Sequence, residues 1–515
     1  MIRGGMVVDG TGRPGYRADV GVVAGRIRDV GILTHVLAPL EIDAAGRFVV
    51  PGFIDTHVHG DAVVSDPAPQ LAALRQGVTA FVLGQDGLSF APSTPEALFW
   101  VTRYFAAVNG SCGALGIEAA PGNGLTVAEL LANYHRTTAL NTVYLIPHGT
   151  VRYSVMGGSS RPPSQQELAT MVRLTEEGLE QGAAGVSSGL GYLPGRFAAA
   201  DELAALCRPA ARRGLPYVTH MRGYGAAAEI GMTEACAIGR LAEVPVHISH
   251  YHGPGRLLTE LVDTALATDL DLTYDTYPYL RGCSILARVL PSWLETTDLD
   301  RTLDSLADPA IRLRLAAETD PALWPQLTLA HVPSDRYRSA IGMRLCKAAR
   351  QAGVTPADFC ADLLIDTALG AGVVFDYPED EQSVRELLRH DAHMAGSDGI
   401  YLGGRPHPRG YGTFARLLRR HVRELGDWTW EQAVVHLAAR PAQRFRLADR
   451  GTIARGQVAD LAVIDPAAIR DHATYARPRA LATGIDDVVV AGVPVLAGGQ
   501  LTGELPGTPL YPMKI

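Results

Sequence analysis

Two histidines stand two residues apart in the string Pro-Gly-Phe-Ile-Asp-Thr-His-Val-His-Gly, at positions His57 and His59. Side chains on a β-strand alternate between its two faces, so both imidazoles are expected to point the same way. Two neutral imidazoles side by side are typical ligands of a metal ion. Because an HxH pair also arises by chance, the rest of the chain must supply further ligands before a metal site is predicted.

Three more residues of the metal-binding type end apolar runs. His220 ends Leu-Pro-Tyr-Val-Thr-His, His250 ends Val-Pro-Val-His-Ile-Ser-His, and Asp398 ends His-Met-Ala-Gly-Ser-Asp. One such histidine alone is more often a hydrogen-bonded core residue than a ligand. Five residues of this kind in the same position favour a shared site. Nitrogen and oxygen ligands with an open coordination position suit a catalytic Zn²⁺ ion.

Short apolar strands alternate with amphipathic helical stretches through the middle of the chain. Apolar residues recur at helical spacing over residues 165–181 and 226–241. Alternating βα units favour parallel strands, and eight of them predict an α/β protein with a closed TIM-like (β/α)8 barrel over residues 51–444. The carboxyl ends of the strands meet at one mouth, where these units place His59, Asp86, His148, Ser188, His220, His250, Tyr277 and Asp398.

Two other regions depart from this alternation. Residues 1–50 and 445–515 both consist of short alternating strands separated by glycine and proline turns. We expect them to form one composite β-sandwich domain in which the two ends of the chain meet. The stretch of sequence between Tyr277 and Asp398 is too long for a single βα unit, which predicts an inserted lid or subdomain at about 285–375.

Composition excludes several classes of protein. The 515 residues are 47% hydrophobic, which is incompatible with a mostly disordered chain. With 46 basic and 54 acidic residues the net charge is -8, so no basic excess exists to bind nucleic acid. We see no signal peptide and no apolar run of membrane-spanning length. These features predict a cytoplasmic protein that acts on a small molecule, without a membrane or nucleic-acid partner.

The complete pattern resembles the amidohydrolase superfamily and, within it, the D-aminoacylases (N-acyl-D-amino-acid deacylases). The resemblance covers essentially the whole chain. It rests on the HxH pair, on the later strand-end ligands and on several longer strings: Gly182-Ala-Ala-Gly-Val-Ser-Ser-Gly-Leu-Gly-Tyr-Leu-Pro-Gly, Thr219-His-Met-Arg, Val246-His-Ile-Ser-His, Asp275-Thr-Tyr-Pro-Tyr, Gly396-Ser-Asp-Gly, His407-Pro-Arg-Gly-Tyr-Gly-Thr-Phe and Arg450-Gly-Thr-Ile-Ala-Arg-Gly-Gln-Val-Ala-Asp-Leu.

The resemblance implies a division of roles among the site residues. A tightly bound zinc ion is expected on Asp86, His220 and His250. A second, weaker metal is expected on His57 and His59 together with Asp398. Asp398 is also implied to take a proton from the attacking water and to give it to the departing amine. Arg409 lies eleven residues beyond Asp398, where the family's arginine holds the substrate carboxylate.

Three residues depart from the family pattern. Asp86 stands where the family carries a cysteine ligand. We expect its carboxylate to bind zinc, although a second interpretation makes it only a turn residue that hydrogen-bonds the backbone after it. His252 stands where the family often has a lysine, and Tyr224 replaces an acidic residue. Both changes concern the substrate pocket.

Lysine is nearly absent from the chain, which contains only Lys347 and Lys514. Many binuclear amidohydrolases bridge their metals with a carboxylated lysine in the barrel. Neither lysine lies at a predicted strand end, and the fourth strand offers Ser187 and Ser188 instead. This composition favours the aminoacylase branch over the hydantoinase branch.

Weaker candidates for the substrate pocket, besides His252, are Tyr192, Tyr279, Ser284 and His148. His148 has an equally good interpretation as a buried structural residue. The predicted function is zinc-dependent hydrolysis of the amide bond of N-acyl-D-amino acids. The departures at Asp86, Tyr224 and His252 leave open another linear amide or a cyclic imide, and a non-catalytic scaffold is the third alternative.

Overall fold

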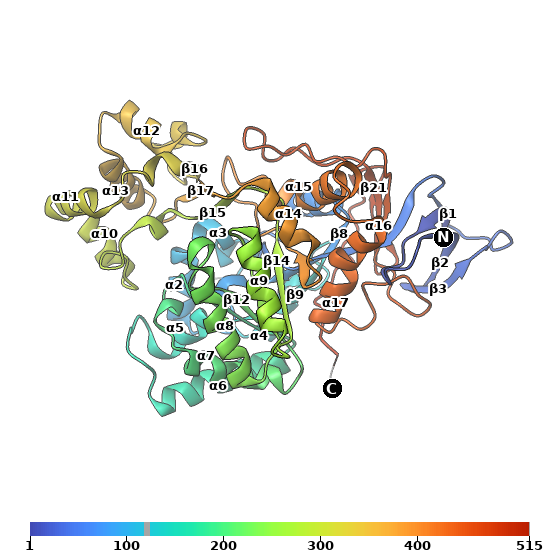
Figure 1. Cartoon of the computed structure of the whole chain (residues 1–515), viewed down its shortest axis with the longest axis horizontal. Coiled ribbons are helices and arrows are strands. Elements are labelled where there is room, and N and C mark those ends of the chain that lie inside the picture. Colours follow the sequence, from blue (N-terminus) through green and yellow to red (C-terminus); the bar gives the residue numbers. More distant parts are fainter. Residues whose placement is uncertain (118–123, 514–515) are drawn as a thin grey trace.

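In the computed structural model, which describes residues 1–117 and 124–513, the two ends of the chain share one β-sheet. Figure 1 shows the blue N-terminal strands beside the red C-terminal segment. Strand β5 of the first segment pairs antiparallel with β20 of the last, with Val49 opposite Val463. The strands are β1 (Ile2–Val7), β2 (Tyr16–Val23), β3 (Arg26–Gly31), β4 (Ile42–Asp43), β5 (Phe48–Pro51), β20 (Leu461–Ile464), β21 (Ile485–Val490), β22 (Val493–Ala497) and β23 (Gln500–Leu501).

Local turn chemistry explains part of this sheet. Ala491 and Gly492 connect β21 to β22 and both have positive φ, 48° and 79°, as expected in a two-residue type I′ hairpin. The buried faces of the strands pack into a small apolar core of their own. The meeting of the two ends was predicted from their shared pattern. The folding of this sheet into two packed layers, and the boundaries at residues 50 and 445, stay predictions.

Parallel strands form the centre of the molecule. They pair in chain order within two runs, and every pairing in them is parallel. Their side chains are almost all buried on both faces, as parallel strands require. The first run is β6 (Phe53–Asp55), β8 (Val78–Leu83) and β9 (Asn141–Tyr144), and the second is β10 (Ile146–Pro147), β11 (Val186–Gly189), β12 (Tyr217–His220), β13 (Val246–Ile248), β14 (Leu272–Thr276) and β18 (His393–Ala395).

Backbone hydrogen bonds also connect the ends of the two runs. The amide of Leu145, between β9 and β10, donates to the Leu83 carbonyl at 3.1 Å. The amide of Thr56, after β6, donates to the Ala395 carbonyl of β18 at 3.2 Å. Short strands β7 (Val58–His59) and β19 (Gly399–Ile400) continue this contact in parallel. The α/β class with parallel strands is therefore confirmed, and closure into a (β/α)8 barrel stays a prediction.

Helices connect successive parallel strands. The two predicted from periodicity are present as α6 (Gln165–Glu180) and α8 (Ala228–Ala242), the second beginning later because a 3₁₀ turn occupies residues 225–227. A capping box fixes the start of α6, since Ser164 and Glu167 satisfy each other's backbone amides. The others around the strands are α1 (Pro67–Leu74), α2 (Pro95–Tyr104), α3 (Ala106–Asn109), α4 (Val127–Tyr134), α5 (His148–Met156), α7 (Ala200–Ala211), α9 (Gly255–Leu266), α14 (Glu381–Arg389), α15 (Arg409–Arg416), α16 (Trp430–Val434) and α17 (Arg440–Arg444).

The long interval between β14 and β18 contains a small unit of its own, at the upper left of Figure 1. Ile285 pairs with Gly372, so the chain leaves and returns at the same place. Its function as a lid stays a prediction. The unit comprises β15 (Arg281–Ile285), β16 (Leu327–His331), β17 (Gly372–Asp376), α10 (Leu299–Ala307), α11 (Pro309–Glu318), α12 (Leu345–Ala352) and α13 (Pro356–Asp366).

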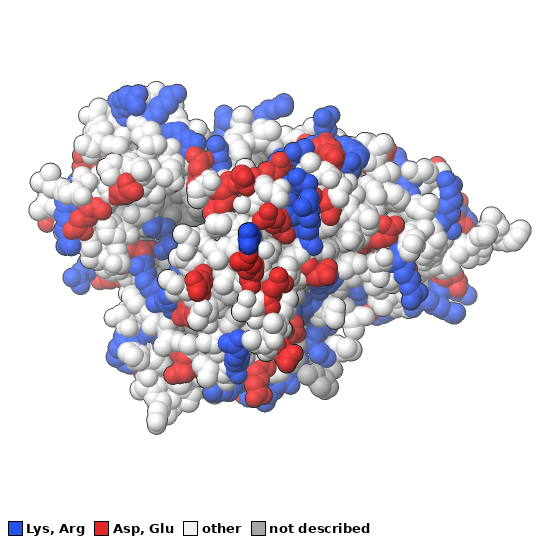
Figure 2. Space-filling view, in the orientation of Figure 1, with Lys and Arg blue, Asp and Glu red and all other residues white. Residues whose placement is uncertain are grey.

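Acidic and basic side chains are interspersed on the face of the molecule shown in Figure 2. Ion pairs between arginines and carboxylates occur on helix surfaces, for example between Arg173 and Glu177 in α6. Among the described residues, no helix combines the length and the apolar character needed to cross a bilayer.

Candidate metal centre and active site

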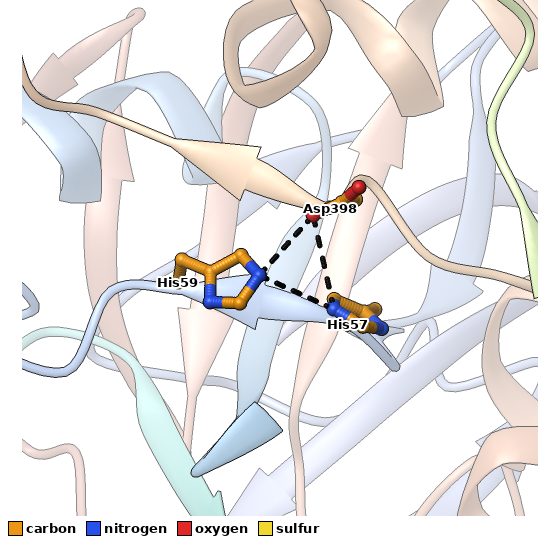
Figure 3. Close-up of side chains that lie close together, drawn as sticks. All are labelled: His57, His59 and Asp398. Carbon is orange, nitrogen blue, oxygen red and sulfur yellow. Dashed lines mark hydrogen bonds and ion pairs between the residues drawn. The ribbon is translucent and has the colours of Figure 1, made fainter. Parts of the chain in front are cut away.

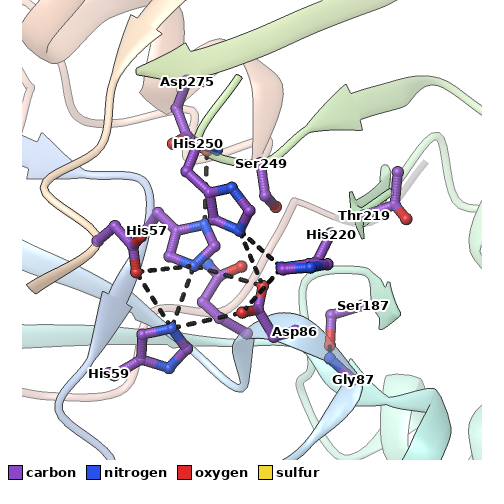
Figure 4. Close-up of polar contacts among 12 residues, drawn as sticks. His57, His59, Asp86, Gly87, Ser187, Thr219, His220, Ser249, His250 and Asp275 are labelled. Atoms are coloured by element: carbon purple, nitrogen blue, oxygen red, sulfur yellow. Dashed lines mark hydrogen bonds and ion pairs between the residues drawn. The ribbon is translucent and has the colours of Figure 1, made fainter. Parts of the chain in front are cut away.

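The six side chains predicted as metal ligands converge at the carboxyl ends of the parallel strands (Figures 3 and 4). Five places along the chain carry them: the β6–β7 segment, the turn after β8, the end of β12, the residues after β13 and the segment after β18. All are buried except His220, whose side chain is 14% exposed. Solvent therefore reaches the cluster on the His220 side.

His57 and His59 point together, as predicted, although only His59 lies on a strand and His57 occupies the bend between β6 and β7. Their Nε2 atoms lie 3.4 Å apart. Oδ1 of Asp398 lies 3.3 Å from Nε2 of His59 and 3.7 Å from Nε2 of His57 (Figure 3). These three residues form one group whose ligand atoms lie close enough together to hold a metal ion.

Asp86 faces the histidines from the opposite side. Its Oδ2 lies 3.4 Å from Nδ1 of His220, and its Oδ1 lies 3.6 Å from Nε2 of His250. The two histidine atoms are themselves 2.9 Å apart. Asp86 also lies 3.6 Å from His57 and 3.7 Å from His59, so its carboxylate stands between the two halves of the cluster.

This set of donor atoms fits a zinc ion. His57, Asp86 and His250 form a second group with ligand atoms within 4.8 Å of one another. In the described part of the chain, Oδ1 of Asp86 is buried without a hydrogen-bond partner, a costly state for a carboxylate oxygen. Imidazole nitrogens and carboxylate oxygens are ligands that zinc accepts. The geometry supports the ligand interpretation of Asp86 over the turn interpretation.

Unusual backbone conformations aim three of these side chains. Asp86, His250 and Asp398 have φ of 56°, 35° and 51°, in the left-handed region that non-glycine residues rarely occupy. Each residue lies two or three positions beyond the end of a strand, where a left-handed turn redirects the chain. Such conformations cost on the order of 1–3 kcal/mol each and cluster at functional sites.

The Asp86 turn is held in place by its neighbours. Gly84 and Gly87 have φ of 76° and 67°, so both supply the sharp bend predicted from the sequence. A Cβ on Gly87 would meet the Gly189 amide nitrogen at 2.7 Å, because the turn packs directly on β11. Ser187 accepts a hydrogen bond from the Gly87 amide and donates one to the Gly84 carbonyl. Serine at this position therefore supports the turn.

Asp275, at the end of β14, contacts both halves of the site from behind. Its Oδ1 accepts a hydrogen bond from the His250 amide at 2.8 Å. Its Oδ2 accepts one from His247 at 2.9 Å and lies 3.6 Å from Nδ1 of His57. Burial opposes the ionised form, but His57 and His247 outweigh it and lower the pKa of Asp275. A charged carboxylate therefore lies behind a candidate ligand, as is common in metal sites.

Arg409 lies next to the candidate proton carrier. Its Nη1 is 2.7 Å from Oδ2 of Asp398, and its guanidinium carbon is 4.8 Å from the Tyr277 ring centroid. Burial alone would raise the pKa of Asp398, but the charge of Arg409 and the contacts of His59 lower it to about 2. Asp398 is thus ionised at neutral pH. Nε and Nη2 of Arg409 are buried without a hydrogen-bond partner among the described residues.

Burial controls the protonation of His220. It lowers the pKa of His220 to about 4, although Asp86 acts in the opposite direction. For His57 and His250, by contrast, burial is outweighed by the neighbouring carboxylates, which raise the pKa of both. A neutral imidazole is the form that binds a metal. For Asp86, burial is outweighed by His220 and His250, which hold its pKa well below the usual range. The cluster therefore presents ionised carboxylates and a neutral imidazole on its open side.

Three predicted pocket residues lie beside the cluster. The Tyr192 ring is 4.8 Å from that of His220, and its hydroxyl is hydrogen-bonded to Ser284 of β15 at 2.9 Å. His252 is stacked between two tyrosines, with ring centroids 4.7 Å from Tyr224 and 4.1 Å from Tyr377. Its Nδ1 donates to the His250 carbonyl at 2.9 Å. The stacked rings of Tyr224, His252 and Tyr377 therefore form an aromatic wall of the site beside His250.

Two predicted pocket residues have other surroundings. His148 begins α5 and is hydrogen-bonded through Nε2 to Glu202 at 2.9 Å, which also pairs with buried Arg152. This network favours its structural interpretation. Tyr279 packs its ring edge-on against His407, with centroids 5.3 Å apart, and against Arg416. These contacts lie on the side of α15 and away from the six candidate metal ligands, so a substrate contact for Tyr279 stays a prediction.

Sequence reasoning missed two polar residues of the site. Asp275 carried a signal, since it is a carboxylate at the end of an apolar strand within a string already quoted for the family resemblance. The sequence around Asn109, which contacts His59, gives no indication of a site residue, because it follows Phe-Ala-Ala-Val in an ordinary apolar helix. Only the folded chain brings it to the site.

Comparison with known proteins agrees with this geometry. Residues 40–496 match the Amidohydrolase family. A D-aminoacylase of Alcaligenes xylosoxydans xylosoxydans is 33% identical over 524 residues, which cover 98% of this chain and 96% of the relative. The family resemblance inferred from the motifs is thereby confirmed.

Two solved structures superpose over nearly the full length. One is a D-aminoacylase studied for its binuclear metal centre, with a TM-score of 0.82, 32% identity and 99% coverage of both chains. The other is the N-acyl-D-glutamate deacylase of Bordetella bronchiseptica in complex with zinc and a phosphonate inhibitor. It has a TM-score of 0.82 and 30% identity, and covers 99% of this chain and 98% of its own.

Proposed function

Because the chain belongs to the amidohydrolase family, we propose that it is a zinc-dependent deacylase that hydrolyses N-acyl-D-amino acids to a D-amino acid and a carboxylate. One observation carries this proposal: a compact cluster of histidines and carboxylates lies beside a buried arginine with free donors. The full-length likeness to D-aminoacylase and to a zinc-bound deacylase supports it. We assign the parallel strands to a closed (β/α)8 barrel, flanked by a β-sandwich domain and a lid.

Two metal positions follow from the arrangement of donors. Asp86, His220 and His250 would hold the tightly bound zinc ion. His57, His59 and Asp398 would hold a second, weaker ion. When bound, zinc lowers the pKa of a coordinated water and polarises the carbonyl to be attacked.

The protein's own groups would handle the proton and the substrate. Asp398, ionised at neutral pH, accepts the proton of the attacking water and returns it to the amine that leaves. Arg409 uses the donors not engaged by Asp398 to bind the α-carboxylate of the substrate. Fixing that carboxylate sets which amide bond faces the water. Tyr192 and Ser284, on the His220 side, line the approach.

One feature of the site also supports a second candidate function. The wall beside His250 is the aromatic stack of Tyr224, His252 and Tyr377, in which burial lowers the pKa of His252 to about 3. A neutral flat wall also suits another linear amide or a cyclic imide. A non-catalytic scaffold, by contrast, does not require buried ligand-type side chains that converge.

The decisive experiment combines metal analysis with a substrate panel. Purified protein is assayed for zinc and for hydrolysis of matched N-acetyl-D- and N-acetyl-L-amino acids and a hydantoin. We expect zinc in the protein, turnover of D-substrates, loss of activity after chelation and its return with zinc. Full activity of metal-free protein refutes the metal role, and turnover of the hydantoin alone replaces the deacylase by the second candidate.

A further inference from the structure

Asn109 contacts a candidate ligand without being a ligand itself. It ends the short helix α3 and is 1% exposed. Its side-chain oxygen Oδ1 lies 3.0 Å from Nδ1 of His59, on the side of the imidazole opposite to the cluster. Nothing in the proposed mechanism uses this residue, and its burial next to a functional imidazole calls for an explanation.

A second hydrogen bond determines which way the amide of Asn109 is oriented. Its Nδ2 donates to the Leu88 carbonyl at 2.7 Å. A carbonyl can only accept, so the NH₂ group must face Leu88 and the oxygen must face His59. The orientation of the amide thus follows from the chemistry of its partners.

The oriented amide fixes the proton on His59. An amide oxygen can only accept, so Nδ1 of His59 must carry the hydrogen in this contact. The neutral imidazole then has its lone pair on Nε2. That atom lies 3.3 Å from Asp398 and 3.4 Å from Nε2 of His57, which is the metal-facing position.

The same residue connects two separate parts of the site. Leu88 comes two residues after Asp86, so the Nδ2 bond reaches the turn that carries the opposite carboxylate. The Asn109 carbonyl accepts a hydrogen bond from the Ala62 amide at 3.3 Å, just beyond His59. The Phe105 ring packs edge-on against His59, with centroids 5.8 Å apart, and closes this side with an apolar group.

We propose that Asn109 is a positioning residue that holds His59 in the Nδ1–H tautomer and so presents Nε2 to the metal. This inference rests on the proposed zinc centre for its functional meaning. The tautomer itself depends only on the contacts of Asn109 with His59 and Leu88.

Zinc affinity tests the proposal through substitutions of similar size. Asn109→Leu removes both amide contacts, whereas Asn109→Asp keeps an oxygen acceptor toward His59. Competition with a chromophoric chelator should show that the second, weaker zinc ion, which His59 would help to hold, binds about 10–100-fold more weakly in Asn109→Leu, the usual effect of losing such a partner. Asn109→Asp should recover most of that loss. The control is Asn133→Leu in α4, whose side-chain amide donates to the Glu129 carbonyl of the same helix, and it should match wild type.

The outcomes separate this inference from the proposed function. Wild-type affinity in a folded Asn109→Leu, or equal losses in the Leu and Asp variants, would overturn the role of Asn109. Absence of zinc binding by the wild type would instead refute the metal centre. If Asn109→Leu does not fold, ¹⁵N NMR of metal-free wild type decides, with the His59 signals identified by their loss in His59→Gln. We expect the Nδ1–H tautomer, and an Nε2–H imidazole overturns the proposal.

Discussion

Nη1 of Arg409 lies 2.7 Å from Oδ2 of Asp398, and both side chains are buried. This contact joins the proposed proton carrier to the proposed anchor for the substrate carboxylate. The guanidinium helps to keep Asp398 ionised while two of its nitrogens remain without a hydrogen-bond partner within residues 1–117 and 124–513. Substitution of Arg409 should therefore affect both substrate binding and proton transfer.

Arg409→Lys tests the carboxylate anchor, because lysine keeps the charge but lacks the planar fork of donors. For N-acetyl-D-methionine we expect kcat/KM to fall by at least about 10²-fold, equivalent to about 2.7 kcal/mol. With N-acetyl-D-methioninamide, which has no α-carboxylate, the loss should be smaller. Equal losses on both substrates would contradict the anchor. Exposed Arg405→Lys serves as the control and should behave as wild type.

Asp398→Asn separates proton transfer from metal binding. The amide is nearly isosteric but cannot accept and return a proton at neutral pH. We expect kcat to fall by at least about 10²-fold while the fold survives. Zinc content measured on the same sample shows whether the effect is catalytic. A near-wild-type rate would remove Asp398 from the mechanism, and loss of tightly bound zinc would make it chiefly a ligand.

Asp86 should be replaceable by cysteine but not by alanine. Asp86→Ala removes the carboxylate that faces His220 and His250, so most tightly bound zinc and most activity should be lost. Asp86→Cys should retain metal, because a thiolate is also a good zinc ligand. Elemental analysis and activity of the two variants are compared. Full zinc content in Asp86→Ala would show that Asp86 is not a ligand.

Acid should destabilise the fold through a buried histidine outside the metal cluster. Burial, reinforced by Arg440, lowers the pKa of His393 to about 3. Below the unfolded-state pKa of about 6.5, the unfolded chain binds a proton that the folded state binds only near pH 3. Stability is therefore complete above pH 6.5 and falls as the pH decreases. From pH 7.5 to 5.5 this single group removes about 1.4 kcal/mol.

Urea unfolding at the two pH values measures this effect. His393→Asn should lose about 1.4 kcal/mol less than wild type between pH 7.5 and 5.5, whatever its absolute stability. Burial also lowers the pKa of the neighbouring His436, which continues to contribute to the pH dependence of stability in both proteins. Exposed His135→Asn is the control and should keep the wild-type difference. An unchanged pH dependence in His393→Asn would refute the assignment.

Local rules of the chain predicted the parts of the site that depend on one strand or one turn. Strand alternation predicted that the imidazoles of His57 and His59 share one face, and their Nε2 atoms do converge, although His57 lies in the bend between β6 and β7. The glycines around Asp86 indicated a sharp bend, and both have positive φ. His220, His250 and Asp398 were found because each follows an apolar run, and parallel strands end on one side.

Contacts between distant segments were decided only by the tertiary structure. Asn109 has an ordinary helical context, and it becomes a partner of His59 because α3 folds back over the strand ends. His148 and Tyr279 likewise have neighbours that the sequence did not indicate: His148 is hydrogen-bonded to Glu202, and Tyr279 packs against His407. Periodicity reports which face of an element is buried, but the partner on that face is chosen by the packing of elements far apart in the chain. The sequence by itself therefore determined the candidate ligands and the family, while the tertiary structure decided which neighbours orient those side chains.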